Sequence, residues 1–302
     1  MFTRLLKLLT LASVTVGAAV AFAGWRWVTP IRRPASAYPD GLETETVRFA
    51  SADGTSLFGV CLTGREGAPG IVLCHGYFRD HFEPLDVGVA LNEAGYHVLL
   101  FDFRGCGQSD GGHTTVGYRE TDDVMAAIQH LSSRLDGRPL GVLGISMGAA
   151  AAIMAGRTAD VATIVADSPF AHLEGVIEQK VRDFTPHSWL IPLSWASIRL
   201  GEALSGGDFR AVRPIDSVRK MPATPIMVIH GERDEFVSGD QIEELIRAMA
   251  GPKELWILDC GHAMARLERA DEYRDRVLRF FDSHLRPGRE PGDESERMSD
   301  SH

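Results

Sequence analysis

The stretch LGVLGISMG, residues 140–148, decides the fold of this chain. Its first residues form a short apolar run, which predicts a buried strand. The next segment, AAAAIMAGR, is rich in strong helix formers and free of proline, which favours a helix. Ser146 therefore lies between a strand and a helix, with Gly144 and Gly148 two positions to either side. This arrangement is typical of a nucleophile elbow.

A turn this tight makes two local predictions. Any side chain larger than glycine at 144 or 148 should clash with neighbouring backbone, and strain should lift the Ser146 hydroxyl out of the sheet. The start of the helix offers free N–H groups and a positive dipole end, so the Met147 N–H is a candidate oxyanion donor. The motif alone is weak, and the alternative is a small-residue turn where a helix packs on a strand. The other parts of a catalytic site must be found elsewhere.

Composition narrows the class of protein. The chain has 302 residues, of which 44% are hydrophobic and 24% charged, enough for one large α/β domain. A formal net charge of −10 argues against nucleic acid as a partner. The cysteines show neither a C-x-x-C pair nor metal-ligand spacing, so we expect buried free thiols at Cys61, Cys74, Cys106 and Cys260.

The segment 1–39 leaves two alternatives open. Residues 8–25 carry no charge and are flanked by basic residues. They could form a retained membrane anchor, with Trp25 and Trp27 at the interface. They could also belong to a secretory signal cleaved at the A-x-A sequence of 21–23, which would give a secreted or periplasmic protein. The anchor is the favoured interpretation.

Strands and helices alternate along the rest of the chain, which calls for a parallel sheet with right-handed crossovers. The first two expected strands are joined by a turn and should form an antiparallel hairpin at a sheet edge. In such sheets ligands bind beyond the carboxyl ends of the strands. The expected strands are 44–49, 57–62, 70–74, 97–101, 140–143, 161–166, 226–229 and 254–258, and the last expected helix is 270–284.

The pattern predicts one α/β domain over 40–286. The connection 171–222 is too long for an ordinary crossover and contains Trp189 and Trp195. We expect it to form a small helical lid over the site; the alternative is a peripheral insertion without a role. The tail 287–302 is polar and lacks aromatic residues, so it is expected to be disordered.

A serine hydroxyl is a poor nucleophile until a base takes its proton. The candidate base is His262, because it follows the last strand in a glycine-containing loop at the same sheet edge as Ser146. Two of the other histidines, His75 and His230, compete for this role. Each directly precedes a glycine at a strand end, a position that favours ordering a loop.

The base needs a carboxylate to fix its tautomer. Asp234 is the candidate, since it gives the chain order Ser, Asp, His that is typical of a nucleophile-elbow site. Asp167, at the end of the preceding strand, is the rival, with the alternative role of bracing a loop. The second oxyanion donor should follow the strand 70–74, and the backbone N–H of Tyr77 supplies it most simply.

Two further polar residues, Asp102 and Arg104, should fasten their own turn.

These pieces together resemble the α/β-hydrolase superfamily, particularly its serine-peptidase-like and Bem46-like members, over roughly residues 44–285. The resemblance implies an eight-stranded, mostly parallel sheet with helices on both faces, no metal and no cofactor. The motifs that carry it are His75-Gly76, Asp102-Phe103-Arg104-Gly105 with Gly107 and Ser109, Gly144-Ile145-Ser146-Met147-Gly148, Asp167-Ser168-Pro169-Phe170, His230-Gly231-Glu232-Arg233-Asp234 and Gly261-His262.

The expected function is a serine hydrolase that cleaves carboxylic esters, including lipid-like acyl esters, with amides and peptides less favoured. Ser146, Asp234 and His262 would be catalytic, and Tyr77 and Met147 would form the oxyanion hole. The expected partner is a small-molecule or lipid-like ester, with membrane contact through the N-terminal segment; the oligomeric state is unknown. Alternatives are an acyltransferase on the same residues and a non-catalytic scaffold on this fold.

Overall fold

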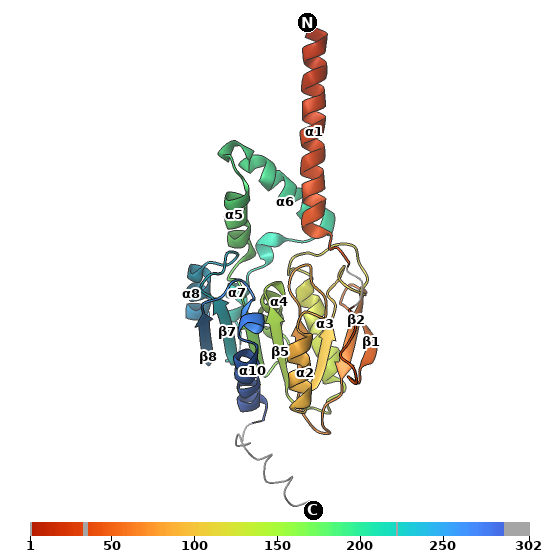
Figure 1. Ribbon diagram of the computed structural model, residues 1–302, viewed down its shortest axis with the longest axis vertical. Helices are drawn as coiled ribbons and strands as arrows, with labels where there is room; N and C mark the ends of the chain where they lie inside the picture. Colours follow the sequence, from red (N-terminus) through yellow and green to blue (C-terminus); the bar gives the residue numbers. More distant parts are fainter. Residues whose placement is uncertain (1, 33–35, 222, 287–302) are drawn as a thin grey trace, which may run out of the picture.

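The structure, a computed structural model, describes residues 2–32, 36–221 and 223–286. Its centre is an eight-stranded sheet with the order β1-β2-β4-β3-β5-β6-β7-β8 (Figure 1). β2 runs antiparallel to both of its neighbours, and all other pairs are parallel. The expected α/β-hydrolase architecture is therefore confirmed. The strands are β1 Glu45–Ala50, β2 Ser56–Leu62, β3 Gly70–Cys74, β4 His97–Phe101, β5 Leu140–Ile145, β6 Thr163–Asp167, β7 Ile226–Gly231 and β8 Lys253–Leu258.

The central strands are buried along their whole length, as continuous apolar runs covered on both faces require. One face packs against α3, α4, α7 and α8, and the other against α2 and α10. The predicted helices on both faces are thus present. Their bounds are α2 Leu85–Glu93, α3 Glu120–Ser132, α4 Met147–Gly156, α7 Pro214–Val218, α8 Gly239–Ala248, α9 Ala265–Glu268 and α10 Ala270–Leu285.

The long connection between β6 and β7 is helical. It contains α5 Leu173–Phe184, η1 Ser188–Leu190, α6 Ile191–Ser205 and η2 Phe209–Ala211, followed by α7. Figure 1 shows α5 and α6 beyond the ends of the strands, on the side from which α1 rises. This placement puts the insertion over the edge of the sheet at which ligands bind in open α/β folds.

Helix α1, Phe2–Val28, projects away from the sheet (Figure 1). In the part of the chain that the structure describes, no helix combines the length and apolar character needed to cross a bilayer. The base of α1 packs on α6, where a Cβ added to Gly24 would lie 2.6 Å from the Ser197 carbonyl oxygen. The segment 287–302, expected to be disordered, lies outside the described residues.

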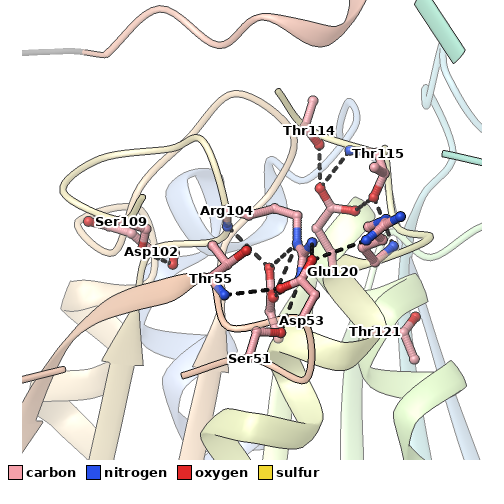
Figure 2. A network of polar contacts seen from close by, with 12 residues as sticks. Ser51, Asp53, Thr55, Asp102, Arg104, Ser109, Thr114, Thr115, Glu120 and Thr121 are labelled. Carbon is pink, nitrogen blue, oxygen red and sulfur yellow. Dashed lines mark hydrogen bonds and ion pairs between the residues drawn. The ribbon is translucent and has the colours of Figure 1, made fainter. Parts of the chain in front are cut away.

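Buried charges fasten the loops beside the site. The Arg104 guanidinium contacts Asp123 at 2.6 Å and Asp53 at 2.7 Å. The Glu120 carboxylate accepts hydrogen bonds from the Thr114 and Thr115 hydroxyls at 2.6 and 2.5 Å (Figure 2).

These contacts hold the loop between β4 and α3 in place. Asp102 accepts the Gln108 N–H at 2.8 Å and so fastens its own turn, as expected, whereas the Arg104 guanidinium joins this loop to Asp53 and Asp123 in other elements. All cysteines are buried and free, as predicted.

Candidate active site

Ser146 occupies a strained turn between β5 and α4. Its φ is 52° and its ψ is −114°, in a region that non-glycine residues rarely adopt. A Cβ added to Gly144 would lie 2.4 Å from the Gly148 carbonyl oxygen, and one added to Gly148 would lie 2.5 Å from the His75 carbonyl oxygen. The predicted clashes at both glycines are thus confirmed, and the sequence explains why this turn can be so tight.

The structure brings together the three side chains singled out from the sequence. The Nε2 atom of His262 lies 2.8 Å from the Ser146 hydroxyl oxygen. The Nδ1 atom of the same ring lies 2.7 Å from Oδ2 of Asp234. With the proton on Nδ1, the ring donates to Asp234 and can accept the proton of Ser146 through Nε2.

Asp234 is held so that one oxygen faces the histidine. Its side chain is fully buried, and Oδ1 accepts the N–H groups of Phe236 at 2.8 Å and Val237 at 2.9 Å. Burial raises the pKa of Asp234, but the hydrogen bond and charge of His262 outweigh it and hold the pKa below its ordinary value. Asp234 therefore stays ionised beside the ring, as stabilising an imidazolium requires.

Two backbone N–H groups, of Tyr77 and Met147, were expected to bind an oxyanion. Among the described residues, neither donates to another protein group. Tyr77 follows β3, and Met147 begins α4 directly after Ser146. The Tyr77 hydroxyl, by contrast, donates to the carbonyl of Trp27. This bond fixes the loop that carries the Tyr77 amide.

The rival carboxylate, Asp167, makes no hydrogen bond to the His262 ring among the described residues. It accepts from the Ser168 hydroxyl at 2.9 Å and the Tyr273 hydroxyl at 3.1 Å. The Ser168 oxygen in turn accepts the Ala263 N–H at 2.9 Å, next to His262. Burial raises the pKa of Asp167 to about 6, although its hydrogen bonds oppose the shift. Asp167 thus braces the loop of His262, which was its alternative role.

Of the two competing histidines, His75 orders a loop, as expected, whereas the Nδ1 atom of His230 has no hydrogen-bond partner among the described residues. The buried His75 ring accepts the Phe103 N–H at 3.0 Å. The buried His230 ring lies behind Asp234, with Nδ1 3.7 Å from Oδ2 of that residue, and burial lowers the pKa of His230. Neither ring contacts Ser146 among the described hydrogen bonds.

Two cavities of different character meet at Ser146 and His262. The larger, about 840 Å³, has walls of mixed character, in which charged side chains such as Arg79, Asp80 and Arg266 alternate with apolar ones. The smaller, about 290 Å³, is enclosed almost wholly by apolar side chains of α5, α6, η2 and the loops beside them. Charged side chains near Ser146 therefore lie in the larger cavity, whereas the smaller one is almost purely apolar.

Three residues that line the site were not predicted from the sequence. The centres of the Phe236 and His262 rings are 5.0 Å apart. The Lys180 ammonium of α5 lies 4.1 Å from the centre of the Phe236 ring. Trp27, considered from the sequence only as an interfacial residue of a membrane anchor, lines the smaller cavity. No sequence motif marks these residues, because they act through tertiary contacts.

Most of the described non-glycine residues with positive φ lie close to this site. Val116, Ser146 and Ala263, which have positive φ, line the two cavities. Phe78 and Ser168, also with positive φ, support the walls, because Phe78 stacks on Tyr77 and the Ser168 hydroxyl accepts the Ala263 N–H. The remaining one among the described residues, Asp136, lies in a turn before β5. Such conformations cost roughly 1–3 kcal/mol each and persist where the surroundings enforce them. Their concentration here marks the site independently of its chemistry.

Among the described residues, no cluster of histidine, cysteine, aspartate or glutamate side chains is suited to hold a metal ion.

The sequence model of the "Alpha/beta hydrolase family" matches residues 71–276. The YqkD protein of Bacillus subtilis is 29% identical over 249 residues, covering 80% of each chain.

A more distant relative is the lysophosphatidylserine lipase ABHD12 of Danio rerio. It is 28% identical over 171 residues, which cover 55% of this chain and 42% of that protein. Among solved structures, an esterase of Pyrococcus furiosus is similar with a TM-score of 0.73 and 27% identity. That similarity covers 86% of this chain and 98% of the esterase.

Proposed function

Because the chain belongs to the α/β-hydrolase family, we propose that it is a serine hydrolase that cleaves carboxylic esters with a compact apolar acyl group. The observation that carries the proposal is the hydrogen-bonded chain Ser146–His262–Asp234 at the mouth of an apolar cavity. The similarity to an esterase of known structure supports it.

The reaction begins when Nε2 of His262 takes the proton of Ser146 and the serine oxygen attacks the ester carbonyl. The N–H groups of Tyr77 and Met147 hold the negative oxygen that forms, and Asp234 stabilises the imidazolium. The C–O bond to the alcohol then breaks, and His262 returns its proton to the departing alcohol. Water, deprotonated by His262, next attacks the acyl-enzyme and releases the carboxylic acid.

The two cavities suggest how an ester is oriented. The acyl chain would lie in the smaller apolar cavity, and the alcohol part would lie in the larger one, which carries the charged side chains. The name of the Danio rerio relative describes a lipase acting on a lipid with an acyl chain and a polar headgroup. An ester of this general kind, with one apolar and one polar end, fits the division of the site.

The test is ester turnover by the wild type and by Ser146→Ala, measured with p-nitrophenyl esters from acetate to palmitate. The variant should lose nearly all turnover, about a thousandfold or more, because no nucleophile remains. Its melting temperature should change little, because the substitution removes one oxygen atom. Equal activity of the two proteins would remove Ser146 from the mechanism.

Labelling separates this proposal from a non-catalytic scaffold. A fluorophosphonate should form an adduct on Ser146 of the folded protein, and intact-protein mass spectrometry should detect it. Failure to form the adduct would favour the scaffold.

An acyltransferase would use the same residues, with an alcohol replacing water in the second step. Product analysis with an added alcohol acceptor distinguishes that activity from hydrolysis.

A further inference from the structure

The last turn of α1 forms part of the wall of the smaller cavity. The Trp27 side chain lines it together with Ile198 of α6 and Phe209 of η2. Ile198 and Phe209 are almost fully buried, whereas Trp27 keeps 37% of its surface exposed. The indole therefore stands between the cavity and solvent, and its removal would lengthen the cavity in that direction.

Backbone hydrogen bonds fix the turn that carries this indole. The Tyr77 hydroxyl donates to the Trp27 carbonyl, and the Thr114 N–H donates to the Val28 carbonyl at 2.8 Å. Val28 itself is fully buried. Since Tyr77 also carries one of the amides assigned to the oxyanion hole, the position of Trp27 is tied directly to the reacting centre.

The insertion holds the same turn from the other side. A Cβ added to Gly201 of α6 would lie 2.7 Å from the Gly24 carbonyl oxygen, so the two helix backbones are in contact. Ile198 lies one turn before Gly201 on α6, and Trp27 lies about one turn after Gly24 on α1. Helices α1 and α6 therefore close the cavity together and hold Ile198 and Trp27 in fixed positions.

We propose that Trp27 is a specificity-determining residue that limits the length of the acyl chain. The inference rests on the proposed function, because it assigns the acyl group to this cavity. A volume of about 290 Å³ lies at the small end of the range of ligand pockets, so a compact acyl chain fills it. A long chain enters only by displacing the indole, which the bonded turn resists. The preferred substrates are therefore esters of short to medium straight-chain carboxylic acids.

The experiment compares Trp27→Ala with the matched control Trp25→Ala. Trp25 belongs to the same helix, is 43% exposed and lines neither cavity. We measure kcat/KM for p-nitrophenyl butyrate, octanoate and palmitate, and the rate at which alkyl fluorophosphonates of matching lengths label Ser146. Opening the wall should raise the palmitate-to-butyrate ratio about tenfold or more in Trp27→Ala, because each methylene in an apolar pocket contributes substantially to discrimination. The control should keep the wild-type ratio.

A second variant guards against a folding defect. Trp27→Phe keeps an aromatic wall of smaller size and should shift the ratio in the same direction by a smaller factor. Unchanged ratios in both folded Trp27 variants, with normal labelling of Ser146, would overturn the assignment of Trp27 and leave the ester hydrolase intact. An equal shift in Trp25→Ala would also overturn it, because the effect would not be specific to the wall. Absence of labelling in the wild type would overturn the proposed function and this inference together.

Discussion

Asp167 shows how a buried carboxyl group makes the stability of this protein depend on pH. Its pKa is raised by burial from 3.8 to about 6, so the folded state binds the proton more tightly than the unfolded chain. Stability must then be greatest below the unfolded value and must fall as the pH rises through the folded value. The shift of about 2 units corresponds to about 3 kcal/mol.

The prediction for Asp167→Asn follows from the direction of this pKa shift. The wild type should lose up to about 3 kcal/mol of unfolding free energy between roughly pH 4 and pH 7 relative to the variant, which has no group to ionise at this position. Urea unfolding across the pH range measures the difference. Asp259→Asn is the control, because that carboxylate is exposed and pairs with Arg233 at the surface. Parallel pH profiles for the wild type and Asp167→Asn would contradict the prediction.

Residues whose polar side chains take part in hydrogen bonding could be predicted one by one from the sequence. Residues that contribute only the shape of an apolar side chain could not. The structure places Asp234 rather than Asp167 against His262, in agreement with the choice made from chain order. Phe236 packs on His262 although nothing in the sequence around it indicates a catalytic loop contact. A hydrogen-bonding side chain at a strand end can take only a few roles, so its role can be predicted. An apolar ring can pack against any neighbouring apolar surface, so its partner cannot.

At the scale of elements, the contact between α1 and α6 depends on the absence of two side chains. Gly24 and Gly201 let the backbones meet, and a Cβ at Gly201 would lie 2.7 Å from a carbonyl oxygen that belongs to backbone and cannot rotate away. Gly201→Val should therefore push the helices apart. Overpacking of this kind costs about 1–3 kcal/mol. Because the same contact positions the walls of the smaller cavity, preference among acyl chain lengths should weaken as well.

The measurement is the unfolding free energy together with the ratio of palmitate to butyrate hydrolysis. Gly17→Val in α1 provides the control, since a Cβ at Gly17 would meet no atom within 4 Å outside the backbone of its own helix. It should leave both quantities near their wild-type values. If Gly201→Val behaved like Gly17→Val, the two helices would not be coupled in solution as they are in the structure.

The strands of the sheet were easier to predict from the sequence than the packing of the first helix, for a physical reason. Strands such as β3 and β5 are continuous apolar runs bounded by turn residues, and only a sheet covered on both faces accommodates such runs. The first helix contains a long uncharged run, residues 8–25, but its composition does not reveal whether lipid or protein covers it. The packing of its last turn on α6 depends on Gly24 and Gly201, which lie far apart in the sequence. Sequence patterns locate elements better than they identify their partners.

At the scale of the whole molecule, the candidate site is assembled from both ends of the chain. Trp27 comes from the first helix, Ser146 from the centre of the sheet, and His262 from the loop after the last strand. The helical insertion closes the smaller cavity over them. The first helix is therefore divided into two parts. Its described residues up to 19 are exposed, whereas residues 24–29 include contacts with the insertion and the core.

Two deletions test this division, each with an initiating methionine retained. Removal of residues 2–19 should leave the melting temperature and the acyl preference nearly unchanged, because the described side chains there are exposed. Removal of residues 2–29 also takes away Trp27 and the fully buried Val28. Losing such apolar burial costs roughly 3–5 kcal/mol, which corresponds to a melting temperature lower by about 10 °C.

The longer deletion should also shift the preference toward long acyl chains, since it removes a wall of the smaller cavity. Thermal unfolding and the ratio of palmitate to butyrate hydrolysis report the two effects separately. If the shorter deletion alone lowered the melting temperature by as much as the longer one, the exposed part of α1 would be stabilised by contacts that the isolated chain does not show. If the longer deletion kept the wild-type ratio, the first helix would not border the acyl group, and the acyl chain would have to bind elsewhere in the site.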